Sequence, residues 1–200
     1  MKNILLVMCV LCFYMFSAAQ TGDGSVIKEI KDFQNGLNNE YKDASTSPLP
    51  AYKRKTFKGI RFFPINTQYI VTASFKRTPG EKVIKVPTSG TEIQDYVKYG
   101  EAHFNLLGKE YTLGIYQSPE LAKKEQYKNY LVIFFKDLTS GKETYGGGRY
   151  IDLTIPAGNT VTINFNKAYQ PYCAYADGYN CPIPPKENYL PVKVMAGVKL

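Results

Sequence analysis

From residue 57 onward, the chain is a succession of short apolar segments separated by glycine, proline and asparagine. Short segments rich in β-branched and aromatic side chains, bounded by such turn residues, are typical of β-strands. Strands joined by short turns pair antiparallel, and a closed or two-layered sheet buries one face and protects its edges. We therefore predict a mainly β fold with an antiparallel β-sandwich or barrel-like body. The predicted strands are residues 57–63, 69–76, 82–86, 94–99, 102–107, 110–117, 130–136, 150–155, 160–165 and 192–196.

Two connections have the composition of hairpin turns. Residues 107–109 (Leu-Gly-Lys) separate two predicted strands, and residues 137–141 (Asp-Leu-Thr-Ser-Gly) follow the segment 130–136. Glycine, aspartate and serine adopt turn conformations readily, so both connections should join antiparallel neighbours. Residues 118–128 are expected to add one or two helical turns.

Before the β segments, the chain predicts one amphipathic helix, from about Ser25 to Lys42. Its apolar positions recur every three or four residues, which places them on one face. Asp23 or Ser25 is suited to cap its start, and Gly36 weakens its middle. The proline-containing stretch 45–50 ends it in an extended segment. The apolar positions are Val26, Ile27, Ile30, Phe33, Leu37 and Tyr41.

The first nineteen residues have the pattern of a signal peptide. Lys2 precedes an apolar run over 4–16, and small residues then lead to Gln20, the expected first mature residue. The run is too short to span a membrane. We therefore predict a signal peptide over 1–19, a helix and extended linker over 20–50, and a single β domain over 51–200. We expect an exported protein, periplasmic or extracellular, without stable membrane insertion. The oligomeric state stays open.

The charge distribution argues against a nucleic-acid partner. The formal net charge is +8, but the lysines and arginines lie in small scattered groups beside acidic residues or turns. Nucleic-acid proteins gather basic residues on one stripe with aromatics between them. We interpret the charge as a contribution to solubility, with weak attraction to anionic envelope polymers as the alternative.

Familiar catalytic and metal motifs are poorly represented. His103 is the only histidine, and its alternating context favours a hydrogen-bonded strand residue over a catalytic base. No serine lies in a Gly-x-Ser-x-Gly elbow. We therefore expect no metal site and no cofactor.

The tyrosine-rich stretch 145–188 contains the candidate site. Consecutive glycines at 146–148 followed by Arg149 could turn backbone N–H groups and a guanidinium toward an anion. The alternative is a bulge or left-handed turn at a strand entrance, with Arg149 paired to Asp152 or Glu143.

Cys173 and Cys181 lie eight residues apart in the same stretch. In an oxidising compartment a disulfide closing this short loop is the natural interpretation; a zinc site would need two more ligands. The following residues 181–185 include three prolines and are predicted to form an extended strap. Nearby tyrosines 169, 172, 175 and 179 could line a pocket for a planar or sugar-like ligand, or simply cover the end of the barrel.

Several motifs together resemble an uncharacterised prokaryotic family, number 1684 among the catalogued domains of unknown function. They are FKGIRFFPIN (57–66), YIVTASF (69–75), FFKDLTSGKETYGGGRYIDL (134–153), INFNKAYQPYCAY (163–175), CPIPPKENYL (181–190) and AGVK (196–199). The resemblance covers nearly all of the mature chain and implies no activity. Its signature falls on Asp137, Thr139, Gly141, Thr144, Tyr145, Gly148, Arg149, Tyr150, Asn166, Tyr169, Pro171, Cys173, Cys181, Pro182, Pro185 and Asn188. Asn164 and Val198 stand where the family usually has acids, which implies that an activity depending on those acids is lost here.

The leading prediction is a domain that binds a small polar or anionic ligand at one concave site, with the 181–185 strap as its wall. The expected ligand-binding residues are Tyr145, Gly147, Gly148, Arg149, Asn166, Tyr169 and Tyr172. One alternative is a hydrolase-like enzyme that uses Tyr145, Arg149, Asp152 and His103 at the same site. The other is a purely structural or protein-partner role.

Overall fold

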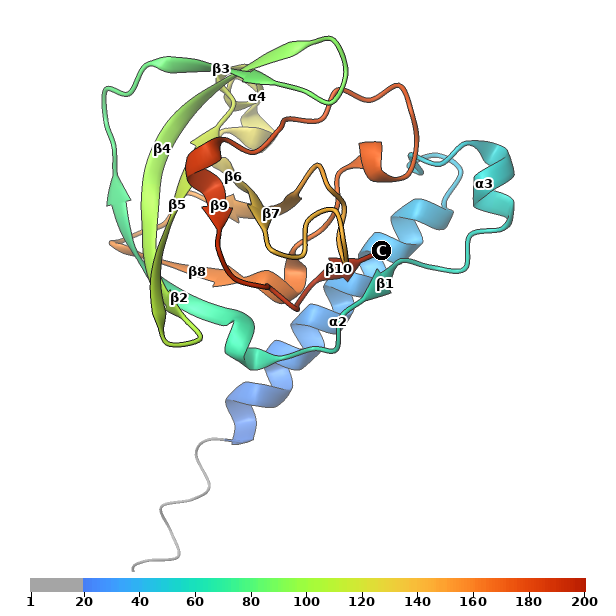
Figure 1. Ribbon diagram of the computed structural model, residues 1–200, viewed down its shortest axis with the longest axis horizontal. Helices are drawn as coiled ribbons and strands as arrows, with labels where there is room; N and C mark the ends of the chain where they lie inside the picture. Colours follow the sequence, from blue (N-terminus) through green and yellow to red (C-terminus); the bar gives the residue numbers. More distant parts are fainter. Residues whose placement is uncertain (1–19) are drawn as a thin grey trace, which may run out of the picture.

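The structure, a computed structural model, describes residues 20–200 and shows a curled β-sheet with a long helix across its outside (Figure 1). The main sheet has the order β7-β6-β5-β4-β2-β8, with β3 beside β4 and β9 beside β6. A short second sheet pairs β1 with β10. The helices are α2 (Gln20–Lys42), α3 (Ala51–Lys55) and α4 (Pro119–Ala122). The strands are β1 (Arg61–Phe62), β2 (Ile70–Arg77), β3 (Val83–Pro87), β4 (Ile93–Leu106), β5 (Lys109–Gln117), β6 (Tyr130–Asp137), β7 (Arg149–Thr154), β8 (Thr160–Asn164), β9 (Tyr189–Leu190) and β10 (Val198–Lys199).

The sheet is an antiparallel half-barrel, apart from the parallel pair β6 and β9. One face carries the main apolar core, which includes Leu113, Ile133, Phe135 and Phe165. The opposite face of β5, β6 and β7 carries a second cluster of aromatic residues. Backbone hydrogen bonds between Tyr150 and Tyr169, 2.8 and 3.0 Å long, bring the segment after β8 to the free edge of β7. The mainly β, barrel-like prediction with an N-terminal helix is therefore confirmed.

Most predicted strands exist, but the predicted break between residues 99 and 102 was wrong. Segments 94–99 and 102–107 form the single strand β4, whose register shifts between Lys98 and Gly100. A Cβ at Gly100 would lie 2.7 Å from the Lys76 carbonyl oxygen, so glycine permits a close approach to β2 here. The glycine thus marks a bulge inside a strand, where the sequence was interpreted as a break.

At both ends of the β region, the prediction also assigned more residues to strands than the structure does. Only Arg61–Phe62 of segment 57–63 is a strand, and segment 192–196 is not one; the terminal strand is Val198–Lys199. In segment 192–196, backbone groups bond to side chains instead, since Val194 donates its N–H to Asp137 over 2.7 Å.

The turn predictions had mixed outcomes. Leu107 and Gly108 have φ values of 52° and 81°, so they form the predicted tight hairpin between β4 and β5. Strands β6 and β7 do pair antiparallel, but their connection spans 138–148 and is no tight hairpin. Residues 118–128 contain α4 and a 3₁₀ turn at Glu125–Tyr127, as expected.

Helix α2 ends at Lys42 as predicted but begins at Gln20, so neither Asp23 nor Ser25 marks its start. Ile30 and Tyr41 are buried, and Tyr41 packs with Leu49, Ile60 and Val198. Asn38 accepts a hydrogen bond of 2.7 Å from the backbone N–H of Ile60, which fixes the helix to the start of the β region. The predicted signal peptide, residues 1–19, lies outside the described residues. No helix within residues 20–200 has both the length and the apolarity to cross a membrane.

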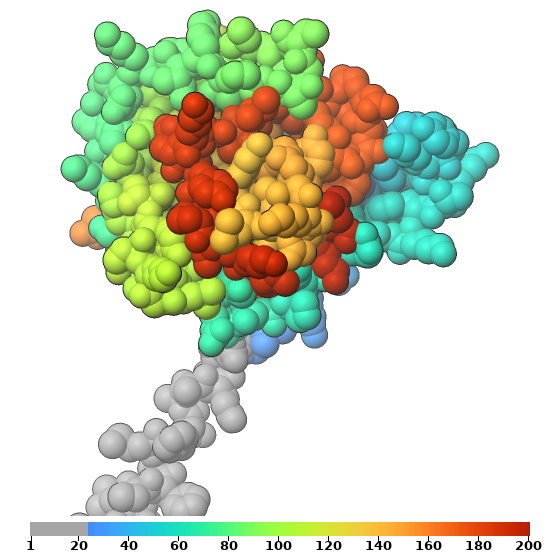
Figure 2. Space-filling model, in the orientation of Figure 1, coloured from blue at the N-terminus to red at the C-terminus, as the bar shows by residue number. Residues whose placement is uncertain are grey.

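The C-terminal segment closes one side of the molecule. In Figure 2 these residues, coloured red, frame the loop before β7, coloured yellow to orange. Asn188 explains part of this packing, because its side chain bonds to the backbone of Gly114 and to the Phe134 carbonyl. These bonds connect β5 and β6 where their own pairing is limited to Tyr116 and Val132.

Candidate functional site

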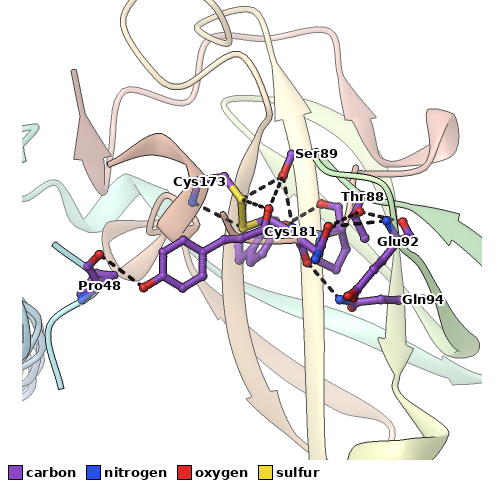
Figure 3. Close-up of a disulfide and its surroundings, with 11 residues drawn as sticks. Pro48, Thr88, Ser89, Glu92, Gln94, Cys173 and Cys181 are labelled. Atoms are coloured by element: carbon purple, nitrogen blue, oxygen red, sulfur yellow. Dashed lines mark hydrogen bonds between the residues drawn. A yellow bond between two sulfur atoms is a disulfide. The ribbon is translucent and has the colours of Figure 1, made fainter. Parts of the chain in front are cut away.

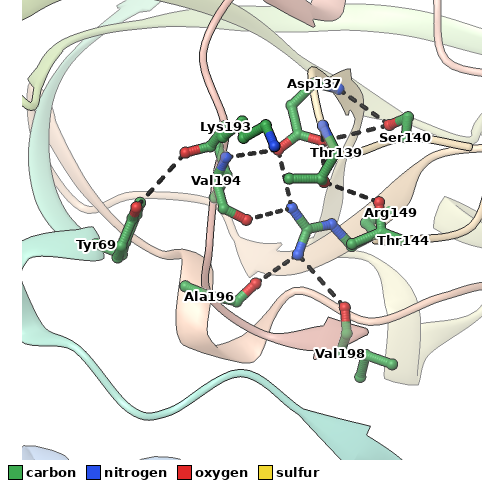
Figure 4. Close-up of polar contacts among 10 residues, drawn as sticks. All are labelled: Tyr69, Asp137, Thr139, Ser140, Thr144, Arg149, Lys193, Val194, Ala196 and Val198. Carbon is green, nitrogen blue, oxygen red and sulfur yellow. Dashed lines mark hydrogen bonds and ion pairs between the residues drawn. The ribbon is translucent and has the colours of Figure 1, made fainter. Parts of the chain in front are cut away.

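Arg149, the centre of the predicted anion site, is enclosed by protein. Its side chain is 1% exposed, and its guanidinium lies 3.2 Å from Asp137, which is itself fully buried. The guanidinium also donates to the carbonyls of Val194, at 2.9 Å, and Ala196 (Figure 4). Burial lowers the pKa of Arg149, and the Asp137 carboxylate opposes that change. Arginine remains charged in proteins, so this is a buried ion pair that holds the C-terminal segment.

This geometry corrects the interpretation of the glycine-arginine motif. Arg149 pairs with Asp137, and neither predicted partner, Asp152 or Glu143, contacts it. Gly148 has a φ of +97°, and a Cβ there would lie 2.7 Å from the Phe135 carbonyl oxygen. The glycine therefore serves a left-handed turn and a close approach to β6, which is the structural alternative.

The other predicted site residues are distributed over separate places. Asn166 is 1% exposed and bonds to both backbone groups of Asn66, each over 2.9 Å, so it joins two loops. Tyr145 packs its ring toward Gly147 and lines a different hollow beside Cys173. Of the predicted set, only Tyr169 and Tyr172 line a cavity beside helix α2. Whether any of these residues contacts a ligand stays a prediction.

A cavity with a volume of about 580 Å³ lies between α2, β7 and the disulfide loop. We call it the tyrosine cavity. Helix α2 forms one wall and the outer face of β7 the floor. The lining residues are Phe33, Gly36, Leu37, Glu40, Tyr150, Asp152, Tyr169, Pro171, Tyr172, Tyr179, Asn180, Cys181 and Pro182.

Asp152 is the polar centre of the floor. Its Oδ1 accepts hydrogen bonds from the hydroxyls of Tyr130, at 2.8 Å, and Tyr169, at 2.7 Å. Asp152 is an exposed residue at the cavity mouth, although many protein atoms lie around its carboxyl. Desolvation therefore raises the pKa of Asp152 above its ordinary value, while the two tyrosine hydrogen bonds oppose that rise. Burial also raises the pKa of Tyr169.

Tyrosine rings form much of the walls. The rings of Tyr150 and Tyr169 meet at 74° with centroids 5.9 Å apart, and those of Tyr172 and Tyr179 meet at 62° with centroids 5.2 Å apart. The Tyr172 hydroxyl donates to Glu40 of α2 over 2.6 Å. The cavity therefore combines flat apolar surfaces with two carboxylates.

The disulfide holds the loop that forms the remaining wall, and the prediction of a Cys173–Cys181 bond is confirmed. Ser89, from the turn after β3, donates to the Cys173 sulfur over 2.8 Å and accepts from the Cys181 N–H over 3.2 Å (Figure 3). The Tyr150 hydroxyl donates to the Pro182 carbonyl. The first two residues of the predicted proline strap, Cys181 and Pro182, thus line the cavity and are anchored to the turn and to the sheet.

The sequence analysis missed the contribution of α2. Phe33 and Leu37 were interpreted as core positions, whereas they also border the cavity beside Gly36 and Glu40. In the sequence, the available signal for a cavity was the pair Gly36 and Glu40, one helical turn apart beside the apolar positions of the helix.

The hydrolase constellation is not assembled. Asp152 faces the cavity, Arg149 lies on the opposite face of β7, and His103 is on β4 bonded to Thr112 over 3.0 Å. Asn164, which stands in place of a family acid, accepts a hydrogen bond of 3.1 Å from the N–H of Asn166 and so caps a 3₁₀ turn.

Comparisons with known proteins identify relatives without a described activity. The family described as a protein of unknown function (DUF1684) matches residues 55–199. The solution NMR structure of an uncharacterised protein from Haloarcula marismortui is similar, with a TM-score of 0.70 and 26% identity. That similarity covers 90% of this chain and 97% of the archaeal one. No curated protein matches.

Proposed function

Because the chain belongs to the DUF1684 family of proteins of unknown function, we propose a function from the cavity itself: the domain binds a small polar molecule there. The observation that carries the proposal is Asp152, a carboxylate placed at the floor of a cavity of about 580 Å³ whose walls are largely aromatic. Small-molecule sites are typically concave and mostly apolar, with a few polar groups that orient the ligand.

The position of the polar groups supports binding over a purely structural role. A carboxylate in an apolar surrounding is costly unless it is paired. Asp152 keeps only neutral hydroxyl partners, Tyr130 and Tyr169, and remains accessible from the cavity. A ligand that contacts this carboxylate would offset part of that cost.

The charge inside the cavity favours a polar ligand over an anionic one. Its lining contains Glu40 and Asp152, and no lysine or arginine is among the lining residues. A carboxylate or phosphate ligand would face repulsion from two like charges. The anionic part of the sequence-based expectation depended on Arg149, whose guanidinium is occupied by Asp137 and backbone carbonyls.

Export is part of the proposal. A disulfide at Cys173–Cys181 persists in an oxidising compartment, and the pattern of residues 1–19 is that of a signal peptide. Mass spectrometry of the protein recovered from envelope and medium fractions of its host tests this directly. A chain starting at Gln20 is expected, and an intact N-terminus retained in the cytoplasm would contradict it.

Binding can be tested by filling the cavity from α2. Gly36 lines the cavity, and a Cβ at this position would meet no atom within 4 Å, so Gly36→Phe places a ring in the cavity without a clash at its root. Gly24→Phe is the matched control, because Gly24 also lies on α2 with open space around it but does not line the cavity.

The readout is saturation-transfer NMR with three polar probes that differ in shape and charge: D-glucose, nicotinamide and choline. We expect at least one probe to receive saturation from the parent and the Gly24→Phe variant, and to lose it with Gly36→Phe. If none of the three receives saturation, or if Gly36→Phe leaves every signal unchanged, the proposed function is wrong.

A further inference from the structure

The cavity has an excess of negative charge that nothing in the described chain balances. None of the ion pairs among the described side chains, residues 24–200, includes Asp152 or Glu40. This is unusual for a chain with a formal net charge of +8, in which lysines are plentiful. Two carboxylates without a cationic partner leave the site complementary to a positively charged ligand.

Asp152 also presents an open acceptor. Both tyrosine hydroxyls, from Tyr130 and Tyr169, donate to the same oxygen, Oδ1. Within residues 20–200 no donor forms a hydrogen bond with Oδ2. The two neutral donors hold the carboxyl in place without cancelling its charge, so the charge stays directed at whatever occupies the cavity.

The walls favour one kind of cation. The rings of Tyr150, Tyr169, Tyr172 and Tyr179 meet in two steeply angled pairs, and Phe33 faces them from α2. Aromatic faces attract cations, and the attraction is larger when the cation is desolvated. A primary ammonium would need several hydrogen-bond acceptors in place of its water, whereas methyl groups around a nitrogen pack on rings without hydrogen bonds.

We propose that the ligand of the tyrosine cavity is a small quaternary ammonium ion, with its charge against Asp152 and Glu40 and its methyl groups against the tyrosine rings. This inference depends on the proposed function, because it names the chemical class of the ligand for the same cavity. The site volume of about 580 Å³ is ample for a trimethylammonium group with a short polar tail.

The test compares two molecules of the same shape. Choline and 3,3-dimethylbutan-1-ol differ only in a positively charged nitrogen in place of a carbon. Isothermal titration at constant low ionic strength should show choline binding at least about tenfold more tightly than the neutral alcohol, since charge is their only difference. Choline binding that is equal to or weaker than that of the alcohol overturns the inference, although binding of the alcohol alone still supports a small-molecule site. Binding of neither compound also overturns the inference.

A charge-removing variant locates the effect. Asp152→Asn keeps an acceptor oxygen for the two tyrosine hydroxyls and should weaken choline binding about tenfold while leaving the neutral alcohol unaffected. Asp32→Asn is the control: it removes the same charge from the exposed pair with Lys28 on α2, outside the cavity, and should leave both affinities unchanged. Equal weakening by both substitutions would mean that only the overall charge attracts choline, which contradicts the proposed site.

Discussion

Replacing Arg149 by methionine tests the claim that this residue holds the fold. The substitution keeps much of the side-chain volume but leaves Asp137 buried without its cation. It also removes the donors to the Val194 and Ala196 carbonyls. Removing one partner of a buried ion pair costs about 3 to 5 kcal/mol, and each buried carbonyl left without a donor costs about 1 to 3 kcal/mol more.

The expected loss for Arg149→Met is therefore at least about 5 kcal/mol, a large share of the roughly 5 to 15 kcal/mol by which domains are stable. Urea unfolding followed by tyrosine fluorescence or circular dichroism measures it as a shift of the midpoint. In a thermal scan each kcal/mol corresponds to about 2 to 4 °C for a chain of this length, so the melting temperature should fall by about 10 °C or more. Arg61→Met, on an exposed position of β1, should stay within about 0.5 kcal/mol of the parent.

A double-mutant cycle separates the ion pair from the other bonds of Arg149. Asp137→Asn removes the orphaned charge and keeps an acceptor for the Val194 N–H, but its amide NH₂ replaces the oxygen that accepts from Thr139 and Ser140. Combined with Arg149→Met, it should recover at least about 2 kcal/mol relative to Arg149→Met alone. The reasoning is refuted if Arg149→Met unfolds at the parent urea concentration, or if the double variant is no more stable than that single variant.

Three further predictions concern the disulfide, the helix and the cavity carboxyl. Reduction of Cys173–Cys181 should add two protons by mass and lower stability by roughly 2 to 3 kcal/mol; two free thiols in the untreated protein would contradict the bond. Ile30→Ala should cost about 2 to 4 kcal/mol by urea unfolding and Lys31→Ala almost nothing, because Ile30 is fully buried and Lys31 is exposed; equal midpoints would mean that α2 is not docked. Asp152→Asn should increase stability at neutral pH. Because folding raises the pKa of Asp152, the parent loses stability as the pH rises through the folded pKa and the carboxyl ionises, whereas the asparagine stays neutral. Below the unfolded pKa both side chains are neutral, so the gain should vanish near pH 3. A neutral-pH midpoint below that of the parent would oppose this.

The sequence alone determined those features that depend on local periodicity and local chain chemistry. The spacing of Ile30, Leu37 and Tyr41 is enough to predict a helix, because side chains three and four positions apart share a face. The short apolar runs predicted most strands for the same kind of reason, and Leu107-Gly108 predicted a hairpin because few residues adopt positive φ. The Cys173–Cys181 bond followed from two cysteines close enough in the chain to meet.

The tertiary structure decided which side chains meet, and local patterns carry no such information. Arg149 and Asp152 are three residues apart, yet β-strand alternation sends Arg149 into the core side, against Asp137, and Asp152 to the other face. The fold also places Asp152 beside Tyr169, seventeen residues later, and in the same cavity as helix α2, more than a hundred residues earlier. An arginine beside three glycines looks identical in sequence whether it faces a ligand or a buried carboxylate, because the difference lies in the residues that the fold places around it.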